Sequence, residues 1–283
     1  MRGIARLLPA LGVLPFLGYL TIFLLVPTLT VVVGAFAEAG QPSLVNVVDL
    51  ANPAVLVSLG HSIALSASTA LIGGVVGALL AYAVVTGRPD GLLRRLVTSV
   101  CGVLAQFGGV TLAFAFIATV GISGVLSVWL DANLGTGLTS STWLFGLNGL
   151  VLVYSYFQIP LMVIVFLPAL DGIRAQWREA ASNLGASTWQ YWRYVGLPLL
   201  APAFLGSLLL LFANAFAAYA TAAALVSQGN PIIPLWIRSA LTSEVILGHQ
   251  NFAYALALEM IVIVALVMTA YSLLVARTSR WIR

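Results

Sequence analysis

Residues 132–170 read ANLGTGLTSSTWLFGLNGLVLVYSYFQIPLMVIVFLPAL, and these 39 residues between Asp131 and Asp171 include no charged side chain. A helix needs about 20 predominantly apolar residues to cross the hydrocarbon core of a membrane. The second half of the stretch is long and apolar enough for one such helix, which we expect at residues 144–167. This segment therefore predicts a membrane protein.

The composition of the whole chain supports this interpretation. Of its 283 residues, 61% are hydrophobic and only 7% are charged, whereas about 25% are charged in an ordinary soluble domain. The mean hydropathy is +1.07. So few charges could not cover the surface of a soluble globule of this size. A soluble enzyme, a secreted domain and a disordered chain are excluded.

The rare reactive residues exclude further classes of site. The chain contains twelve Arg and no Lys, so it lacks the Lys of a Walker-type phosphate loop. Cys101 is the single cysteine, and His61 and His249 are far apart in the sequence. Neither a cysteine-based zinc site nor a His-Glu-x-x-His motif is present. We expect no metal site and no catalytic residue in this chain.

Charged residues divide the sequence into six long apolar stretches, each with room for one membrane-spanning helix. The apolar part of the first stretch is roughly twice as long as the 7–15 residues of a signal peptide, which favours a retained helix. The fold class is therefore an all-α integral membrane protein, with residues 1–283 forming a single transmembrane domain. The expected helices lie at 9–37, 59–86, 96–120, 144–167, 200–226 and 252–276. Within the second, Gly73 and Gly77 form a Gly-x-x-x-Gly pattern, which favours close helix packing.

The arginines indicate the orientation. With six spans, eleven of the twelve lie at the two termini or in the second and fourth loops, and only Arg238 falls on the other side. Basic residues mark the cytoplasmic side of a membrane protein, so both termini are expected there. This placement explains the net charge of +4 through the membrane, and no nucleic-acid partner is needed.

The loop at residues 169–199 has its own helical signals. Trp177, Ala181 and Leu184 belong to an apolar stripe with helical spacing, and Gly185 follows as a helix stop. Ser187 and Gln190 have the spacing of a capping box that opens a second short helix. On these residues alone, the loop is either an amphipathic hairpin on the lipid surface or a docking element for a cytoplasmic partner.

The same loop carries Glu179-Ala180-Ala181, then Gly185, Val195 and Leu197-Pro198. This pattern resembles the permease subunits of binding-protein-dependent type I ABC importers. Their inner loop reads Glu-Ala-Ala, three residues, Gly, nine residues, Ile, one residue, Leu-Pro. Val195 in place of Ile is the one departure. The resemblance implies the six-helix permease fold in a bacterial cytoplasmic membrane.

It also implies the partners. In such importers the loop is a coupling helix that sits on a cytoplasmic ATPase dimer, which binds ATP and Mg, so the permease chain carries no cofactor. A second permease subunit and an extracytoplasmic substrate-binding protein complete the complex. The coupling residues implied here are Glu179, Ala180, Ala181, Gly185, Leu197 and Pro198.

Polar side chains within the apolar stretches mark a candidate substrate pathway, because such groups normally face protein or a water-filled cavity. For each one, a hydrogen bond to a neighbouring helix is the alternative. Glu259 stands out as the ionisable residue well inside an apolar stretch. The candidates are Gln106, Tyr154, Tyr156, Gln158, Asn214, Tyr219 and Glu259.

For the substrate, residues 166–172 and 212–216 bring the chain closest to the polyamine (spermidine and putrescine) importer group. A cationic substrate would suit Glu259. The open alternatives are ferric iron, thiamine, phosphonate or an oxyanion. A self-sufficient secondary transporter would be expected to show inverted repeats, and an intramembrane enzyme would need a catalytic constellation; neither is found in the sequence.

Overall fold

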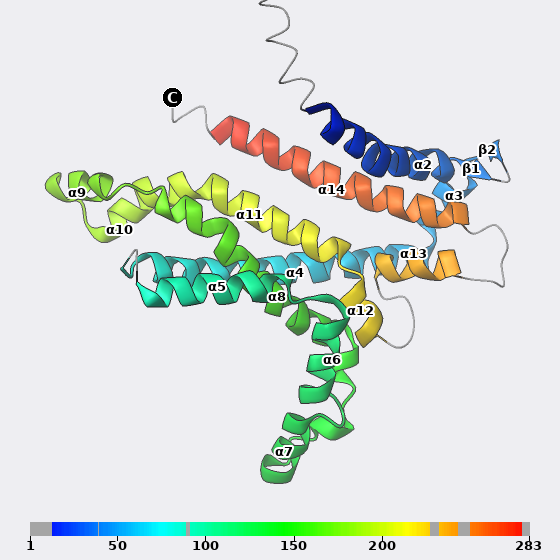
Figure 1. Cartoon of the computed structure of the whole chain (residues 1–283), viewed down its shortest axis with the longest axis horizontal. Helices are drawn as coiled ribbons and strands as arrows, with labels where there is room; N and C mark the ends of the chain where they lie inside the picture. Colours follow the sequence, from blue (N-terminus) through cyan, green and yellow to red (C-terminus); the bar gives the residue numbers. More distant parts are fainter. Residues whose placement is uncertain (1–12, 39, 89–90, 227–231, 243–249, 279–283) are drawn as a thin grey trace, which may run out of the picture. The chain divides into compact units, whose positions relative to one another are not determined.

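The computed structural model describes residues 13–38, 40–88, 91–226, 232–242 and 250–278. The regular structure of this part is helical apart from a two-stranded antiparallel hairpin, in which Ala37 pairs with Pro42 and Glu38 with Gln41. Residues 9–12, the expected start of the first helix, lie outside the described residues. Figure 1 shows the arrangement. The elements are η1 (Thr21–Leu25), α2 (Val26–Ala35), β1 (Ala37–Glu38), β2 (Gln41–Pro42), α3 (Val45–Val48), η2 (Asp49–Ala51), α4 (Pro53–Val85), α5 (Leu92–Gln106), α6 (Gly109–Val120), α7 (Val125–Leu134), η3 (Leu138–Ser140), η4 (Trp143–Phe145), α8 (Leu147–Asp171), α9 (Ala175–Asn183), α10 (Thr188–Tyr191), η5 (Trp192–Gly196), α11 (Leu197–Ala217), α12 (Ala220–Leu225), α13 (Ile233–Thr242) and α14 (Gln250–Thr278).

Six helical segments of the described chain are long and apolar enough to cross a membrane, which confirms the predicted fold class. Leu147–Asp171 is the most buried of them. Its polar side chains Tyr154, Ser155 and Gln158 are buried, as expected of polar groups at membrane depth, which normally face protein or a water-filled cavity. The six segments are Val13–Ala35, Pro53–Val85, Gly109–Leu134, Leu147–Asp171, Thr188–Ala217 and Asn251–Leu273.

The chain separates into two compact units. The first comprises residues up to 57 together with 236–263, and the second comprises 58–235 together with the residues from 264 onward. Within the first unit, Gly34 of α2 lies directly against the ring of Tyr254 on α14. Within the second, α8 packs against both α5 and α11. The second unit therefore holds the main helical bundle.

Close packing of α4 on α8 rests on two glycines. A Cβ atom added to Gly73 would lie 2.7 Å from Cβ of Gln158, and one added to Gly77 would lie 2.5 Å from Cβ of Met162. No larger residue fits at either position without a shift of α8. The packing role predicted for this Gly-x-x-x-Gly pattern is confirmed.

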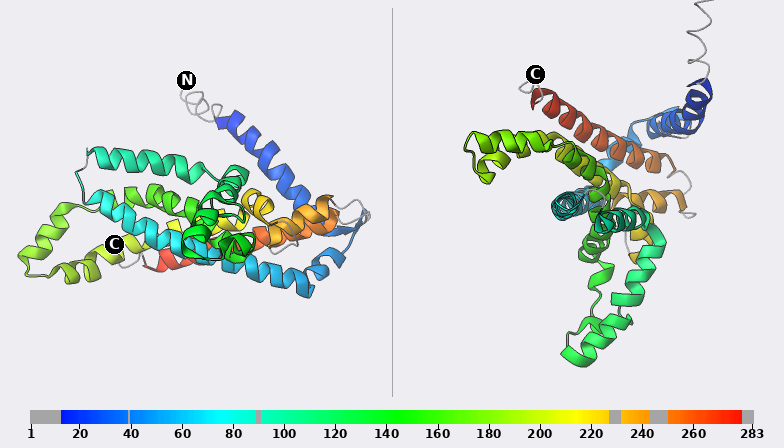
Figure 2. Two further views of the ribbon diagram at one scale, coloured as in Figure 1. Left: turned by 90° about the horizontal axis from the view of Figure 1, so that it is seen from below. Right: turned by 60° about the vertical axis from the view of Figure 1, so that its left-hand side comes forward.

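Two of the expected helices are each broken into two, which corrects the sequence prediction. The stretch expected as one helix at 96–120 forms α5 and α6, because Gly108 is extended and Gly109 has φ of +73°. The stretch expected at 200–226 forms α11 and α12, with an extended residue at Ala218. Figures 1 and 2 show α6 and α7 leaving the bundle at a steep angle beyond the first break.

Candidate functional site

A cavity of about 270 Å³ lies where the two helix breaks meet. Its polar side chains are those of Gln106, Asn214, Tyr219 and Thr221, of which the first three were predicted for a substrate pathway. The end of α5, the start of α6 and the α11–α12 break supply most of the wall. Among the residues that line it, none has a charged side chain. They are Ala105, Gln106, Gly108, Gly109, Phe157, Asn214, Ala217, Ala218, Tyr219, Ala220 and Thr221.

Side-chain hydrogen bonds satisfy the irregular backbone at both breaks. The amide of Gly109 donates to Oγ1 of Thr221 at 2.9 Å, and the same hydroxyl donates to the Gly109 carbonyl at 3.3 Å. The Tyr154 hydroxyl donates to the carbonyl of Ala218 at 2.6 Å. Non-helical backbone at membrane depth is tolerated only where protein groups or water satisfy it. Thr221 and Tyr154 therefore make both breaks possible.

Gln158 is fully buried and fixes a residue of the cavity wall. Its Nε2 donates to the carbonyl of Leu211 at 2.6 Å, and its Oε1 accepts from Nδ2 of Asn214 at 3.3 Å. Burying an unpaired amide would be costly, so this pair of bonds fixes both amide groups. Gln158 and Tyr154, both predicted for a pathway, are not among the residues that line this cavity, but they bond to Asn214 and Ala218, which are.

Two other predicted pathway residues are not brought to this cavity. Tyr156 packs edge-on against Phe116, with 5.7 Å between the ring centroids. Glu259 lies on the part of α14 that belongs to the first unit, is half-buried, and is not among the lining residues. The wall residues Gly108 and Gly109 were not predicted. A Gly-Gly pair inside an apolar stretch is the sequence signal that could have marked them.

The inner loop follows its local sequence signals. Gly185 has φ of +79°, and the Ala186 amide donates to the Ala181 carbonyl at 3.0 Å, which closes the end of α9. The predicted capping box is confirmed. The Ser187 amide donates to Oε1 of Gln190 at 2.7 Å, and the Gln190 amide donates to the Ser187 hydroxyl at 3.3 Å.

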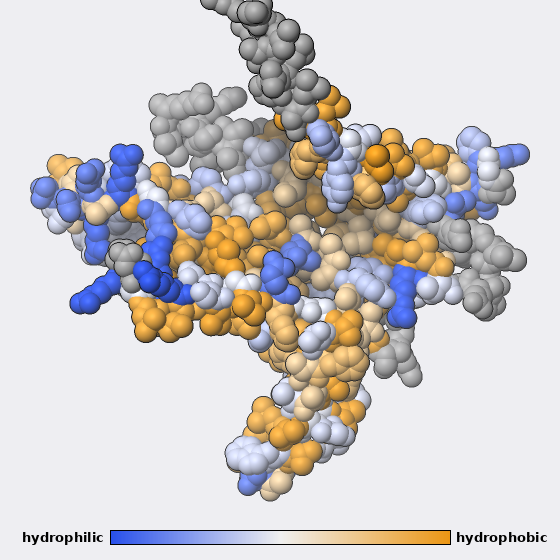
Figure 3. Space-filling view, viewed as in Figure 1, coloured by the Kyte–Doolittle hydropathy of each residue, from blue (hydrophilic) through white to orange (hydrophobic). Residues whose placement is uncertain are grey.

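The motif residues of this loop are largely open to their surroundings. Glu179 and Ala180 are exposed, as are Leu197 and Pro198 at the start of α11. Leu184 is 87% exposed although it is apolar. Beside it lies a cavity of about 370 Å³ between α9 and the start of α11. Figure 3 shows hydrophilic residues gathered at the end of the second unit that carries α9 and α10.

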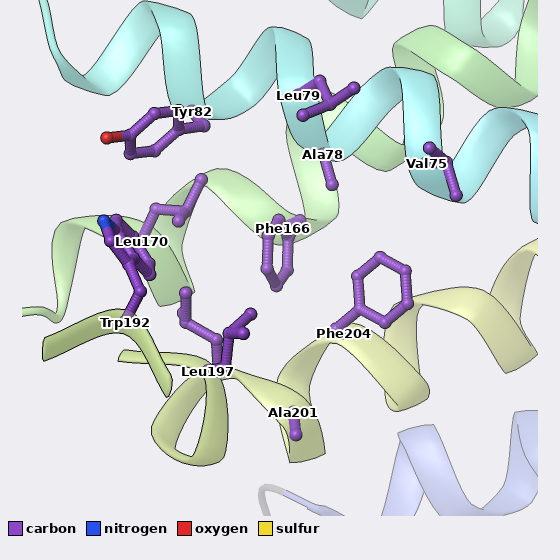
Figure 4. A pocket seen from close by; sticks show the side chains of 11 residues that line it. Val75, Ala78, Leu79, Tyr82, Phe166, Leu170, Trp192, Leu197, Ala201 and Phe204 are labelled. Carbon is purple, nitrogen blue, oxygen red and sulfur yellow. The ribbon is translucent and has the colours of Figure 1, made fainter. Parts of the chain in front are cut away.

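A larger cavity, of about 510 Å³, lies between α4, α8 and α11 (Figure 4). Figure 4 shows its wall of aliphatic and aromatic side chains, with the Tyr82 hydroxyl pointing away from the centre. Such a wall offers a polar solute almost no hydrogen-bond partner, so the smaller cavity at the helix breaks is the better candidate for a polar passage. The lining residues are Val75, Ala78, Leu79, Tyr82, Phe166, Leu170, Trp192, Leu197, Leu200, Ala201 and Phe204.

Comparison with known proteins identifies a matching protein family. The profile described as "Binding-protein-dependent transport system inner membrane component" matches residues 73–280. The chain is 30% identical over 175 residues to the sulfate transport system permease protein CysW of Escherichia coli K12. That match covers 62% of this chain and spans 56% of the length of CysW.

Other transport permeases match a larger share of this chain at lower sequence identity. The sulfate transport system permease protein CysT of Escherichia coli K12 is 26% identical over 79% of this chain and 77% of its own length. A probable molybdenum ABC transporter permease protein of Haloferax volcanii is 28% identical over 83% of this chain and 82% of its own length. Permeases named for thiamine and for ferric iron match 54% and 69% of this chain.

The fold also matches solved structures. A bacterial ABC transporter for the import of the acidic polysaccharide alginate aligns with a TM-score of 0.79 over 98% of both chains, at 18% identity. At this identity the likeness shows the fold alone.

Proposed function

Because this chain belongs to the family of binding-protein-dependent transport system inner membrane components, we propose that it conducts a small oxyanion, such as sulfate or molybdate, through the cavity at the helix breaks. The chain is a multi-pass inner-membrane permease of an ABC importer and is not itself catalytic. The solute, the passage and the coupling residues are the proposed part.

The observation that carries the proposal is the set of uncharged polar side chains in the cavity wall, which has no charged residue among its lining. The amides of Gln106 and Asn214 and the hydroxyl of Tyr219 supply hydrogen-bond donors to an anion without a fixed charge that would trap it. Helix α6 also begins at this wall, and the N-terminal end of a helix favours negative charge. A solute in transit needs binding that is favourable but weak enough for release.

The polyamine prediction finds less support. A polycation would require carboxylates along its path, and the cavity wall has none among its lining residues. Glu259, the carboxylate on which that prediction rested, is not part of this wall. The relatives named for sulfate and molybdenum favour the oxyanion alternative, and molybdenum is carried in water as the oxyanion molybdate.

We further propose that residues 169–199 couple the passage to a cytoplasmic ATPase dimer that binds ATP and Mg. Glu179, Ala180, Ala181, Gly185, Leu197 and Pro198 would form the contact. The exposure of Glu179 and Ala180 supports a docking role, as does the hollow beside Leu184, because a contiguous exposed apolar surface marks an interaction site.

The wider complex follows from the same family. We propose that residues 1–283 act as one permease domain beside a second permease subunit, with both termini in the cytoplasm. An extracytoplasmic substrate-binding protein would deliver the solute. The solved alginate transporter is described in complex with a substrate-bound periplasmic protein, which supports this arrangement.

The test is uptake of labelled sulfate by the complete complex in proteoliposomes, with molybdate, thiamine, ferric citrate and spermidine as competitors. We expect molybdate to compete and spermidine not to. Asn214→Asp places a carboxylate in the wall, and it should lower sulfate uptake about tenfold or more because like charges repel in a weakly hydrated site. Asn133→Asp makes the same change on α7, where the amide only bonds its own helix at Trp129, and should have little effect.

Uptake of spermidine but not sulfate, or stimulation of spermidine uptake by Asn214→Asp, would replace the oxyanion with a cation. Thiamine or iron uptake in the same assay would select those alternatives.

A further inference from the structure

The two helix breaks divide the core of the second unit. One buried apolar cluster contains Leu112 and Ala113 of α6 together with Ala222 and Leu225 of α12. The other contains Cys101 of α5 and, among others, Met162 and Leu211. Helix α5 thus contributes buried residues to one cluster, and α6 and α12 contribute theirs to the other. Helices α8 and α11 contribute buried residues to both clusters and join them.

One hydroxyl group joins the two breaks. Oγ1 of Thr221 accepts from the Gly109 amide and donates to the Gly109 carbonyl, and Thr221 is 2% exposed. We call this pair of bonds the Gly109–Thr221 joint. The amide and the carbonyl of Gly109 both bond to the Thr221 hydroxyl. A displacement of α12 at Thr221 would therefore displace the start of α6 as well.

We propose that Thr221 is a positioning residue that makes α6 and α12 move as one body and holds the cavity in its resting form. The inference rests on the passage proposed above but not on which solute crosses it. In an importer the conformation of the permease and the activity of its ATPase bias each other. Weakening the resting form should therefore raise the rate of ATP hydrolysis measured without binding protein.

The test compares Thr221→Val, which keeps the shape and removes the hydroxyl, with Thr221→Ser, which keeps the hydroxyl. The complete complex is reconstituted, and its basal hydrolysis of Mg-ATP is measured without binding protein or solute. Thr221→Val should raise the basal rate about threefold to tenfold, the range that corresponds to one interhelical hydrogen bond in a membrane. Thr221→Ser should stay near the wild-type rate.

Thr69→Val is the matched control. Thr69 is also fully buried, but its hydroxyl bonds only the carbonyls of Leu65 and Ser66 in its own helix. The same substitution there should leave the basal rate unchanged. An equal rise with Thr69→Val would mean that any buried Thr→Val change loosens the bundle, and it would overturn the inference.

Gly109→Ala tests the joint from its other side. Cβ would have room, 3.6 Å from Cβ of Ala220, but φ of +73° is strained for alanine. It should also raise the basal rate, and the double variant should rise less than the product of the two factors because both changes act on one joint. A wild-type basal rate in assembled Thr221→Val overturns the proposal. A second combination of results also overturns it. If Thr221→Val does not assemble and Gly109→Ala keeps the wild-type basal rate, Thr221 serves folding alone.

The basal readings use Mg-ATP alone. Failure of sulfate competition would therefore refute the proposed solute and leave the evidence on the joint in place.

Discussion

The inner loop and the helix-break cavity are built in opposite ways. The loop takes its shape from neighbours a few residues apart, through the left-handed Gly185 and the Ser187–Gln190 capping box. The cavity takes its shape from residues far apart in the chain, of which Gly109 and Thr221 are separated by 112 positions. The loop is exposed, whereas Thr221 and Gln158 are buried.

This difference separates two kinds of sensitivity. An exposed loop that is held by local contacts keeps its fold when one side chain changes. The same change can remove part of the surface that a partner binds. A cavity assembled by long-range packing loses its shape when a helix beneath it moves. Substitutions in the two regions should therefore affect activity and stability in different proportions.

The largest effect is expected at the loop. Gly185→Asp should reduce uptake and binding-protein-stimulated ATP hydrolysis at least tenfold, while the melting temperature of the isolated chain stays within a few degrees. No heavy atom lies within 4 Å of the Cβ position, so the cost within the chain is the roughly 1–2 kcal/mol of a left-handed non-glycine residue. The added charge acts at the proposed docking surface.

Gly40→Asp is the control for that variant. Gly40 has φ of +80° and equally open space, but it lies in the β1–β2 turn. Full stimulation of the ATPase in Gly185→Asp, or equal loss in Gly40→Asp, would remove the loop from the coupling machinery.

A smaller, combined effect is expected beneath the cavity. Gly73→Ala should lower both the melting temperature and uptake, because its Cβ would lie 2.7 Å from Cβ of Gln158, the residue that holds Asn214. Overpacking of this kind costs about 1–3 kcal/mol. Gly60→Ala on the same helix meets nothing within 4 Å and should be neutral or slightly stabilising. Unfolding followed by circular dichroism and transport assays would reveal whether the two losses occur together, as the comparison requires.

The smallest effect is expected at Glu259. Glu259→Gln keeps the shape of the side chain and removes its charge, and sulfate uptake should remain within about twofold of wild type because the passage of an anion does not need this carboxylate. A severe loss of uptake in a complex that assembles normally would return Glu259 to the passage and revive the cation hypothesis.

The amino-acid sequence predicts the two regions unequally for the same reason. Glu179, Gly185 and the capping box are recognised because their signals lie within one short segment. The six apolar stretches likewise predict the spans, since each is a property of consecutive residues. Polar residues within the apolar stretches gave seven candidates for a pathway, and three of them, Gln106, Asn214 and Tyr219, line the cavity.

The helix breaks required information that a linear pattern does not contain. Residues 96–120 are apolar enough for a continuous helix, and the hydroxyl that compensates the break at Gly109 comes from Thr221. The direction of each polar side chain is set by packing, so Gln158 and Tyr154 were expected in a pathway and instead support its wall. Glu259 has suitable chemistry but lies on a different unit.

The break at Gly109 also has a consequence for synthesis. Helices α5 and α6 contain 15 and 12 residues, so each is shorter than the roughly 30 Å of a hydrocarbon core at ~1.5 Å per residue. The third apolar stretch enters the bilayer before residue 221 has been translated, and Gly109 then has no hydroxyl partner. A continuous helix satisfies its backbone best in lipid at that stage. The backbone of Gly109 therefore gains its hydroxyl partner only after residue 221 has been made, so the break at the third apolar stretch is completed by a residue from the fifth.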